Sequence, residues 1–311
     1  MADRRRWSAL ARGALLATTV CSLARAELGV VQGADTSTTT ARQLAQQLAP
    51  GVSIVSASLR GTNGAVGSFS GGSSAGLDLD QGIVLSSGRV LDAIGPNLEP
   101  DMSTDWGDDL GDAQLAQILG TDTTDAAALT FLFSCPAGSR SVTVDYVFAS
   151  DAYEGFTDPG DIDEYDGAAV IVDGINAATL PGPVPLSAPA LPARAVFRDN
   201  NSCHEDEALP CPFNLEADGF SGKLTAHAPL TGSGTHTAKV VIADDFLPDV
   251  DSWIFLRGFA CNAEVFARPV PTSGGFGSLG LAAGLLAVAS LALSRTRRFG
   301  AARFRAAPSA R

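Results

Sequence analysis

Carboxylates are the side chains of this 311-residue chain best placed to do chemistry, because they gather in three short stretches of the sequence. The stretches are 101–112, 151–166 and 244–251. Oxygen ligands at irregular spacing suit Ca²⁺, which accepts about six to eight oxygens in a flexible geometry. The second and third stretches are therefore predicted to bind Ca²⁺. The preferred ligands are Asp158, Asp163, Asp245 and Asp249.

Two other interpretations of the acidic stretches stay open. Aspartates in turns often bond their own backbone amides in solvent, and Asp151 and Asp251, which adjoin predicted strand ends, suit that capping role. A pair of carboxylates about 5 to 10 Å apart would instead suit a hydrolase of extracellular polysaccharide. An EF-hand is excluded, because the third acid of Asp161-x-Asp163-x-x-Asp166 comes one residue late and no Glu closes the loop.

The three tyrosines lie at or beside the second acidic stretch. Tyr146 alternates with apolar residues, so it is assigned to the core. Tyr153 and Tyr165, together with Glu154, are predicted to line a binding edge.

Other catalytic patterns are weak. Gly72-Ser-Ser-Ala-Gly76 fits G-x-S-x-G, but a nucleophile elbow needs a strand before it and a helix after it, and a glycine-rich turn and strand are expected here instead. The three histidines have no metal-ligand partner at i+4. No catalytic residue is assigned, and the chain is predicted not to be an enzyme.

Four cysteines remain once a signal peptide carrying Cys21 is removed, an even number that favours disulfides. Cys203 and Cys211 are predicted to close a short loop, and Cys135 and Cys261, which each follow an apolar run, are predicted to form the second pair. Four cysteines allow three connectivities, so Cys135 with Cys203 stays an alternative.

The two ends are basic and the body is acidic. Residues 27–268 hold 10 basic and 33 acidic residues, a net charge of −23. A body of that charge repels phosphate backbones, which makes nucleic acid an unsuitable partner.

The N-terminal end has an arginine-rich start, an apolar stretch and an A-x-A site, which together predict a signal peptide over 1–26. Near the C-terminus, Phe276 to Leu293 carries no charge and is followed by arginines, which predicts a hydrophobic helix that contacts the membrane before processing. Residues 269–298 form the predicted sorting or transmembrane segment, and 299–311 form a basic cytoplasmic tail.

Between these ends, the pattern is mainly β. Helical spacing predicts one helix over 38–48 and a second short one over 113–119. The other apolar runs read as strands without alternating helices, which favours a β-sandwich of jelly-roll type over 27–268. Prolines crowd 181–192, so that stretch is expected to be a surface loop or insertion.

Three boxes carry a resemblance to a known family. They are Gly82-Ile-Val-Leu-Ser-Ser-Gly with Gly95-Pro-Asn, then Tyr146-Val-Phe-Ala-Ser-Asp-Ala-Tyr-Glu, then Ile242-Ala-Asp-Asp with Asp251-Ser-Trp-Ile-Phe-Leu. Over residues 35–262 the order and spacing resemble the choice-of-anchor L domain. The chain departs from the family at Asp-Ala-Tyr-Glu, where Ser-Glu-Glu-Tyr is usual. The resemblance implies a place among surface proteins with different C-terminal anchors and implies no reaction.

The tail resembles bacterial three-part sorting signals. PVPTSGGFGSLG before the apolar run is closest to the GlyGly-CTERM type, and the PEP-CTERM type fits less well because Val-Pro-Thr replaces Val-Pro-Glu-Pro. That resemblance implies cleavage by a sorting protease. We therefore expect an exported protein that passes the inner membrane and reaches the cell surface, where it acts as a non-enzymatic adhesion or matrix module.

Overall fold

The computed structural model describes residues 27–107, 110–153, 165–205, 210–245 and 248–264, all within the compact unit Met1–Val265. The predicted signal peptide, the sorting segment with its hydrophobic helix, and the basic tail lie outside the described residues. Within the described ranges, no helix is long and apolar enough to cross a membrane.

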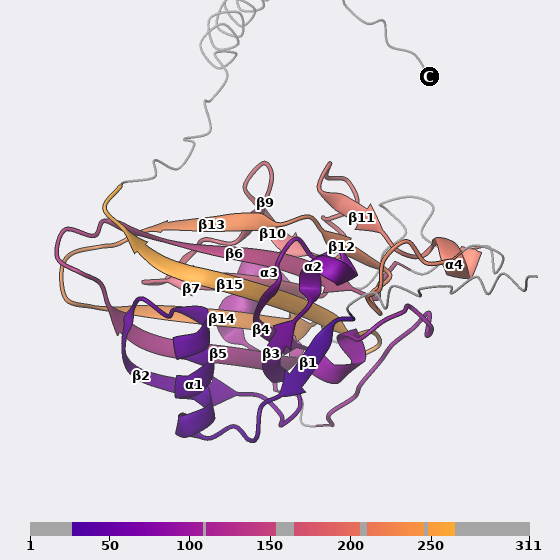
Figure 1. Ribbon diagram of the computed structural model, residues 1–311, viewed down its shortest axis with the longest axis horizontal. Coiled ribbons are helices and arrows are strands. Elements are labelled where there is room, and N and C mark those ends of the chain that lie inside the picture. The colour runs from indigo at the N-terminus through magenta and orange to yellow at the C-terminus, as the bar shows by residue number, and fades with distance from the viewer. Residues whose placement is uncertain (1–26, 108–109, 154–164, 206–209, 246–247, 265–311) are drawn as a thin grey trace, which may run out of the picture. The chain divides into compact units, whose positions relative to one another are not determined.

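Two antiparallel sheets make up the domain (Figure 1). The eight-stranded sheet contains, in spatial order, β1 (Gly29–Gln32), β3 (Val66–Ser70), β4 (Gln81–Ser86), β15 (Ser252–Asn262), β6 (Ser141–Ser150), β12 (Gly219–Ser221) and β11 (Phe197–Asp199), with β13 (Leu224–Pro229) also paired to β6. The seven-stranded sheet contains β2 (Ser53–Arg60), β5 (Thr124–Ser134), β14 (Thr235–Asp244), β7 (Gly167–Val172), β10 (Val184–Ser187) and β9 (Thr179–Leu180), with β8 (Ile175–Asn176) paired to β7.

The chain passes back and forth between the sheets. From β4 to β7 and again from β13 to β15, each strand lies in the sheet opposite to the one before it. The central strands are ordered β4-β15-β6-β13 in one sheet and β5-β14-β7-β10 in the other. This alternation is the two-sheet pattern of a jelly roll and agrees with the predicted mainly β sandwich.

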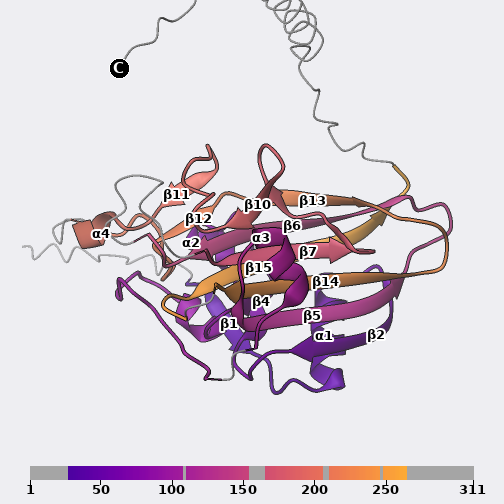
Figure 2. The same cartoon turned by 180° about the vertical axis from the view of Figure 1, so that it is seen from behind.

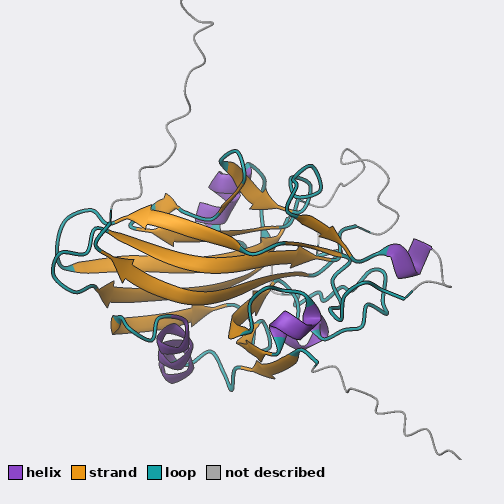
Figure 3. Ribbon diagram, turned by 45° about the horizontal axis from the view of Figure 1, so that its top comes forward, coloured by secondary structure: helices purple, strands orange, loops and turns teal. Residues whose placement is uncertain are grey.

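The helices lie outside the sheets (Figure 3). They are α1 (Thr38–Leu48), α2 (Gly72–Ala75), the 3₁₀ turn η1 (Val90–Ala93), α3 (Ala113–Leu119) and α4 (Ser202–Glu205). The two predicted helices are confirmed as α1 and α3. Ser37 caps α1 by accepting the Thr40 amide, and Asp112 caps α3 by accepting the amides of Gln114 and Leu115.

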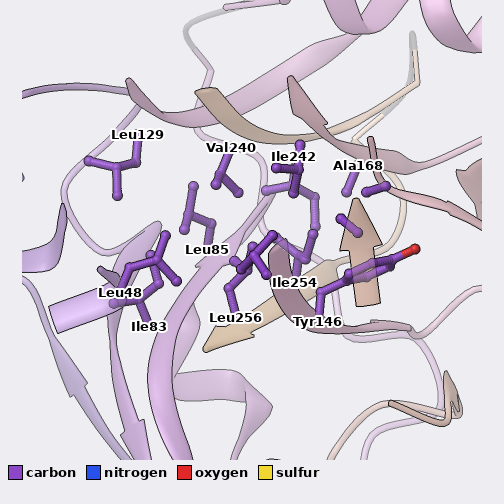
Figure 4. Close-up of a cluster of buried hydrophobic side chains, with 14 of the residues drawn as sticks. Leu48, Ile83, Leu85, Leu129, Tyr146, Ala168, Val240, Ile242, Ile254 and Leu256 are labelled. Carbon is purple, nitrogen blue, oxygen red and sulfur yellow. The ribbon is translucent and has the colours of Figure 1, made fainter. Parts of the chain in front are cut away.

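The main core fills the space between the sheets (Figure 4). Alternate residues of β6, among them Val144, Tyr146 and Phe148, point into it, as their period of two predicts. The intervening residues Val147 and Ala149 belong to a second core on the outer face of the eight-stranded sheet. A third, smaller cluster lies under α3 on the outer face of the seven-stranded sheet (Figure 2). Both sheets are therefore covered on two sides.

The proline-rich stretch is not entirely a loop. Val184–Ser187 forms β10, in which Pro185 pairs with Thr179 of β9, and Leu186 and Ser187 pair with β7. The prediction failed here because a proline is tolerated near the edge of a sheet, where β10 and β9 are the last two strands.

Candidate functional site

Four strand ends meet at one end of the sandwich, and each carries an aspartate. Asp151 follows β6, Asp166 precedes β7, Asp244 ends β14 and Asp251 precedes β15. All are buried. Together with two neighbours they form what we call the buried acidic cluster, whose members are between 0% and 4% exposed: Asp125, Asp151, Asp166, Asp244, Asp245 and Asp251. The expectation that these aspartates lie in solvent therefore does not hold for the five of them that belong to the predicted stretches, Asp125 not being one of those.

The predicted second and third acidic stretches are in contact through this cluster. Asp166 Oδ1 accepts the Asp245 amide at 3.3 Å, and Asp245 Oδ2 accepts the Tyr165 amide at 3.3 Å. Ser252 Oγ lies 2.7 Å from Asp166 Oδ2 and 2.9 Å from Ser150 Oγ. Two stretches about 80 residues apart in the sequence thus form one polar site, because antiparallel strands bring their ends together.

Asp151 and Asp251 act as backbone caps, as one of the two interpretations expected. Asp151 accepts the amides of Met102 at 2.6 Å and Asp218 at 3.0 Å. Asp251 accepts the amide and the hydroxyl of Thr104 at 2.8 and 2.9 Å. These bonds fasten residues 102–104, from the first acidic stretch, against the strand ends.

The approach of the Asp251 carboxyl explains a glycine in the first family-like box. A Cβ at Gly88 would collide with all the carboxyl atoms of Asp251. Its neighbour Ser87 accepts the Ser252 amide on Oγ at 2.9 Å. The Ser-Ser-Gly turn therefore packs directly against the cluster, a role that sequence reasoning did not assign to it.

Asp244 differs from its neighbours. Its side chain is fully buried, and neither carboxyl oxygen has a hydrogen-bond partner among the described residues. Burial, and then the nearby Asp166 charge, raise the pKa of Asp244 well above its usual range. Burial likewise raises the pKa of Asp166 to about 8, against hydrogen bonds from Ser252 and the Asp245 backbone that lower it.

The predicted metal ligands are only partly placed. Asp158 and Asp163 lie outside the described residues, as does Glu154. Asp245 belongs to the cluster, whereas Asp249 is exposed. Across the described ranges, no group of three or more His, Cys, Asp or Glu side chains has the geometry to hold a metal ion.

The two predicted binding tyrosines have different environments. Tyr153 is 1% exposed, donates its hydroxyl to the Ala188 carbonyl at 3.1 Å and packs edge-on against Phe197. Tyr153 is thus a residue of the main core and not part of an exposed binding edge. Tyr165 is 50% exposed and lines a shallow pocket of about 280 Å³ with Leu119, Pro185 and Pro189.

Gly72-Ser-Ser-Ala-Gly76 lies between β3 and β4, so strands surround it as expected, and only the single helical turn α2 (Gly72–Ala75) forms within it rather than the helix of a nucleophile elbow. Ser74 is exposed, and none of its hydrogen bonds in the described ranges involves a histidine. His236 Nδ1 instead contacts Asp173 Oδ2 at 2.8 Å.

Both predicted disulfides are confirmed. Cys135 at the end of β5 is bonded to Cys261 in β15, which joins the two sheets, and Cys203 is bonded to Cys211. The alternative pairing of Cys135 with Cys203 is therefore wrong.

A second polar region lies on the outer face of the seven-stranded sheet. A groove of about 380 Å³ is lined by residues that include Ser58, Thr130 and Asp112. Asp112 is 4% exposed, caps α3, and accepts Lys239 Nζ at 2.6 Å. Although burial raises the pKa of Asp112, the hydrogen bonds from Lys239 and the backbone bring the net value below the usual one.

We expect Asp112→Ala to lower the free energy of unfolding by roughly 2–4 kcal/mol, because it removes a helix cap and leaves the largely buried Lys239 ammonium without its carboxylate partner. Asp112→Asn keeps the cap and should cost less. Since the folded pKa is depressed, the stabilisation is present at neutral pH and disappears as the pH falls through the folded pKa. Urea unfolding at pH 7 and pH 3 measures both effects, and equal stabilities of Asp112→Ala and wild type at pH 7 would contradict this role.

Comparisons with known proteins give a family but no activity. A search of the curated proteins found no match. Among solved structures, the chain is similar at 12% identity and a TM-score of 0.21 to one titled "Crystal structure of Agl-KA catalytic domain", over 58% of this chain and 30% of that one. The likeness is too slight to carry an argument. The family model of the Choice-of-anchor L domain matches residues 32–262, which include every strand from β2 to β15 and the whole buried acidic cluster. The chain therefore belongs to the choice-of-anchor L domain family.

Proposed function

We propose that this chain is an exported protein that acts at the cell surface as a non-enzymatic binding or structural module. The observation that carries the proposal is the pair of disulfides, Cys135–Cys261 and Cys203–Cys211. Disulfides form and persist in oxidising compartments outside the cytosol. Membership of a family that is named for its varied anchors supports a surface address.

Delivery follows from the two ends of the sequence. In this proposal the segment 1–26 directs export and is removed near Ala26. The segment 269–298 holds the chain at the inner membrane, with the tail 299–311 on the cytoplasmic side, until a sorting protease cuts between Ser273 and Gly280.

The binding half of the proposal rests on Tyr165. Its half-exposed ring lies beside two prolines and Leu119 in a shallow pocket. A ring with an apolar face and a hydroxyl edge suits the face of a sugar ring or an apolar side chain of a surface or matrix partner. The pocket is open and small, which fits attachment to an extended partner rather than enclosure of a small molecule.

The test uses the chain with both ends intact in a cell that sorts it. Protease added to intact cells should digest the domain, and the surface-released form should have an intact mass that lacks both 1–26 and the apolar run. Tyr165→Ser should weaken attachment to cells or matrix about tenfold at an unchanged melting temperature. Val31→Ser, which replaces an apolar side chain that is 68% exposed on β1, is the matched control and should leave attachment unchanged.

Two results would overturn the proposal. One is protection of the domain from external protease in intact cells. The other is turnover on a panel of extracellular glycans that Glu154→Gln abolishes, because that result would establish the alternative function, a carboxylate-based polysaccharide hydrolase.

A further inference from the structure

Asp244 is the least satisfied polar side chain in the described part of the molecule, because both of its carboxyl oxygens are buried without a hydrogen-bond partner. It ends β14, in the middle of the seven-stranded sheet, and is 0% exposed. Burying a carboxylate without a partner costs several kcal/mol, and natural proteins meet that cost by pairing the charge, protonating it or binding a metal.

The surroundings of Asp244 provide negative charge and no cation. Asp166, Asp251 and Asp125 all act on it with the repulsion of like charges. Among the ion pairs of the described ranges, none includes Asp166 or Asp244. What the cluster lacks is a positive charge that can contact two carboxylates at once.

A proton would compensate the buried carboxylates of Asp244 and Asp166 less well than a metal ion would. A protonated Asp244 carries an O–H donor that must find an acceptor, and both of its oxygens lack a partner of hydrogen-bond geometry. A proton shared with Asp166 would remove one of the like charges that act on Asp244, but those of Asp251 and Asp125 would remain in place. A cation contacts both oxygens of a carboxylate together, and so removes the repulsion and the missing contacts in one step.

The neighbouring groups are oxygen donors of the kind that Ca²⁺ prefers. The Asp166 carboxyl has one oxygen 2.7 Å from the Ser252 hydroxyl, and the Ser87 side chain is close enough to Asp244 to lower its pKa against the effect of burial. We propose that Asp244 and Asp166 hold one Ca²⁺ at the meeting point of β14, β7 and the Ser-Ser-Gly turn after β4, with the Ser87 hydroxyl and water as further ligands. Two carboxylates neutralise a divalent ion, and a flexible mixed set of oxygens suits Ca²⁺ better than Mg²⁺, which demands octahedral geometry.

This site differs from the ligand set expected from the sequence. Asp249 is exposed, and the ligand at the end of β14 is Asp244 rather than its neighbour Asp245, because only Asp244 has both oxygens buried without a hydrogen-bond partner among the described residues. The ion would link the ends of β7 and β14 to the turn after β4 in the other sheet. The proposal does not depend on where the chain is delivered.

The test compares the purified full chain with Asp244→Asn and with Asp249→Asn, its matched control in the neighbouring loop. The wild-type chain should retain about one Ca²⁺ per chain in elemental analysis, and its melting temperature in millimolar Ca²⁺ should exceed that in excess chelator by roughly 5–10 °C. Asp249→Asn should behave like the wild type. Asp244→Asn should retain no Ca²⁺, and in chelator it should melt at or above the wild-type temperature, because it has lost a buried charge.

The outcomes separate the cation from the proton. Wild-type chain without bound metal, with superimposable melting curves in Ca²⁺ and chelator, overturns the proposal and leaves a shared proton. Retention of one Ca²⁺ by Asp244→Asn overturns the assignment of this residue. Should Asp244→Asn not fold, Asp166→Asn takes its place, with a Ca²⁺ affinity expected to fall at least about tenfold.

Discussion

Replacement of both Cys135 and Cys261 by alanine should lower the free energy of unfolding by about 5 kcal/mol. The bond joins residues 126 positions apart, and on the chain-entropy model a cross-link stabilises mainly by restricting the unfolded chain, more so for longer loops. It also ties the end of β5 to β15, which lie in different sheets. Urea unfolding without reductant, followed by tryptophan fluorescence, measures the loss.

The short disulfide is the internal control for this prediction. Cys203 and Cys211 are only 8 residues apart, so the same model gives about 2.5 kcal/mol for their replacement. The double alanine variants should therefore differ by a factor of about two. A variant without Cys135 and Cys261 that is as stable as the one without Cys203 and Cys211 would show that loop length does not govern the effect here.

Trp253→Ala should be the most damaging of the single core substitutions, with a loss of about 3–5 kcal/mol. The indole is 0% exposed in the second core, outside the eight-stranded sheet, and its Nε1 donates to the Arg89 carbonyl at 3.0 Å. Alanine leaves a cavity in a covered layer and also removes the donor to that carbonyl. Chemical unfolding, followed by circular dichroism, gives the change in stability.

Two further variants serve as comparisons for Trp253→Ala. Trp253→Phe fills part of the cavity but cannot donate, so its loss should lie between those of wild type and alanine. Leu98→Ala, at a leucine that is 69% exposed, should change stability by less than about 0.5 kcal/mol. A loss below about 1 kcal/mol for Trp253→Ala would mean that this outer layer contributes little to the fold.

Local signals were enough to predict the long elements. The helix over 38–48 has apolar residues at helical spacing and a Pro-Gly stop, and its observed bounds are the predicted ones. The long strands β5, β6, β14 and β15 contain alternating or continuous apolar runs, which predict strands, whereas β1 and the six-residue β13 were not predicted. The short strands β8 to β12 were not predicted, because two to four residues carry no period, and such strands form only where a neighbouring strand offers its edge.

The buried acidic cluster could be predicted only in outline. The sequence showed two acidic stretches, and Asp151 and Asp251 were correctly considered as caps. That Asp166 and Asp244 are buried was not predictable, because a charged residue at a strand end is usually solvated and only the tertiary fold covers it. Asp244 follows a run of apolar residues in β14, which is the one local hint that its position faces the interior.

The position of the long disulfide determines how the domain carries a mechanical load. β15 is the last strand of the domain and pairs with β4 on one side and β6 on the other, while Cys261, one residue before the strand ends at Asn262, is covalently linked to β5. A pull on the segment that follows residue 264 therefore reaches Cys261 first, and the covalent bond passes the force into the opposite sheet. Only the residues beyond Cys261 can be peeled away. After reduction, the same pull would unzip β15 from its free end, one backbone hydrogen bond at a time.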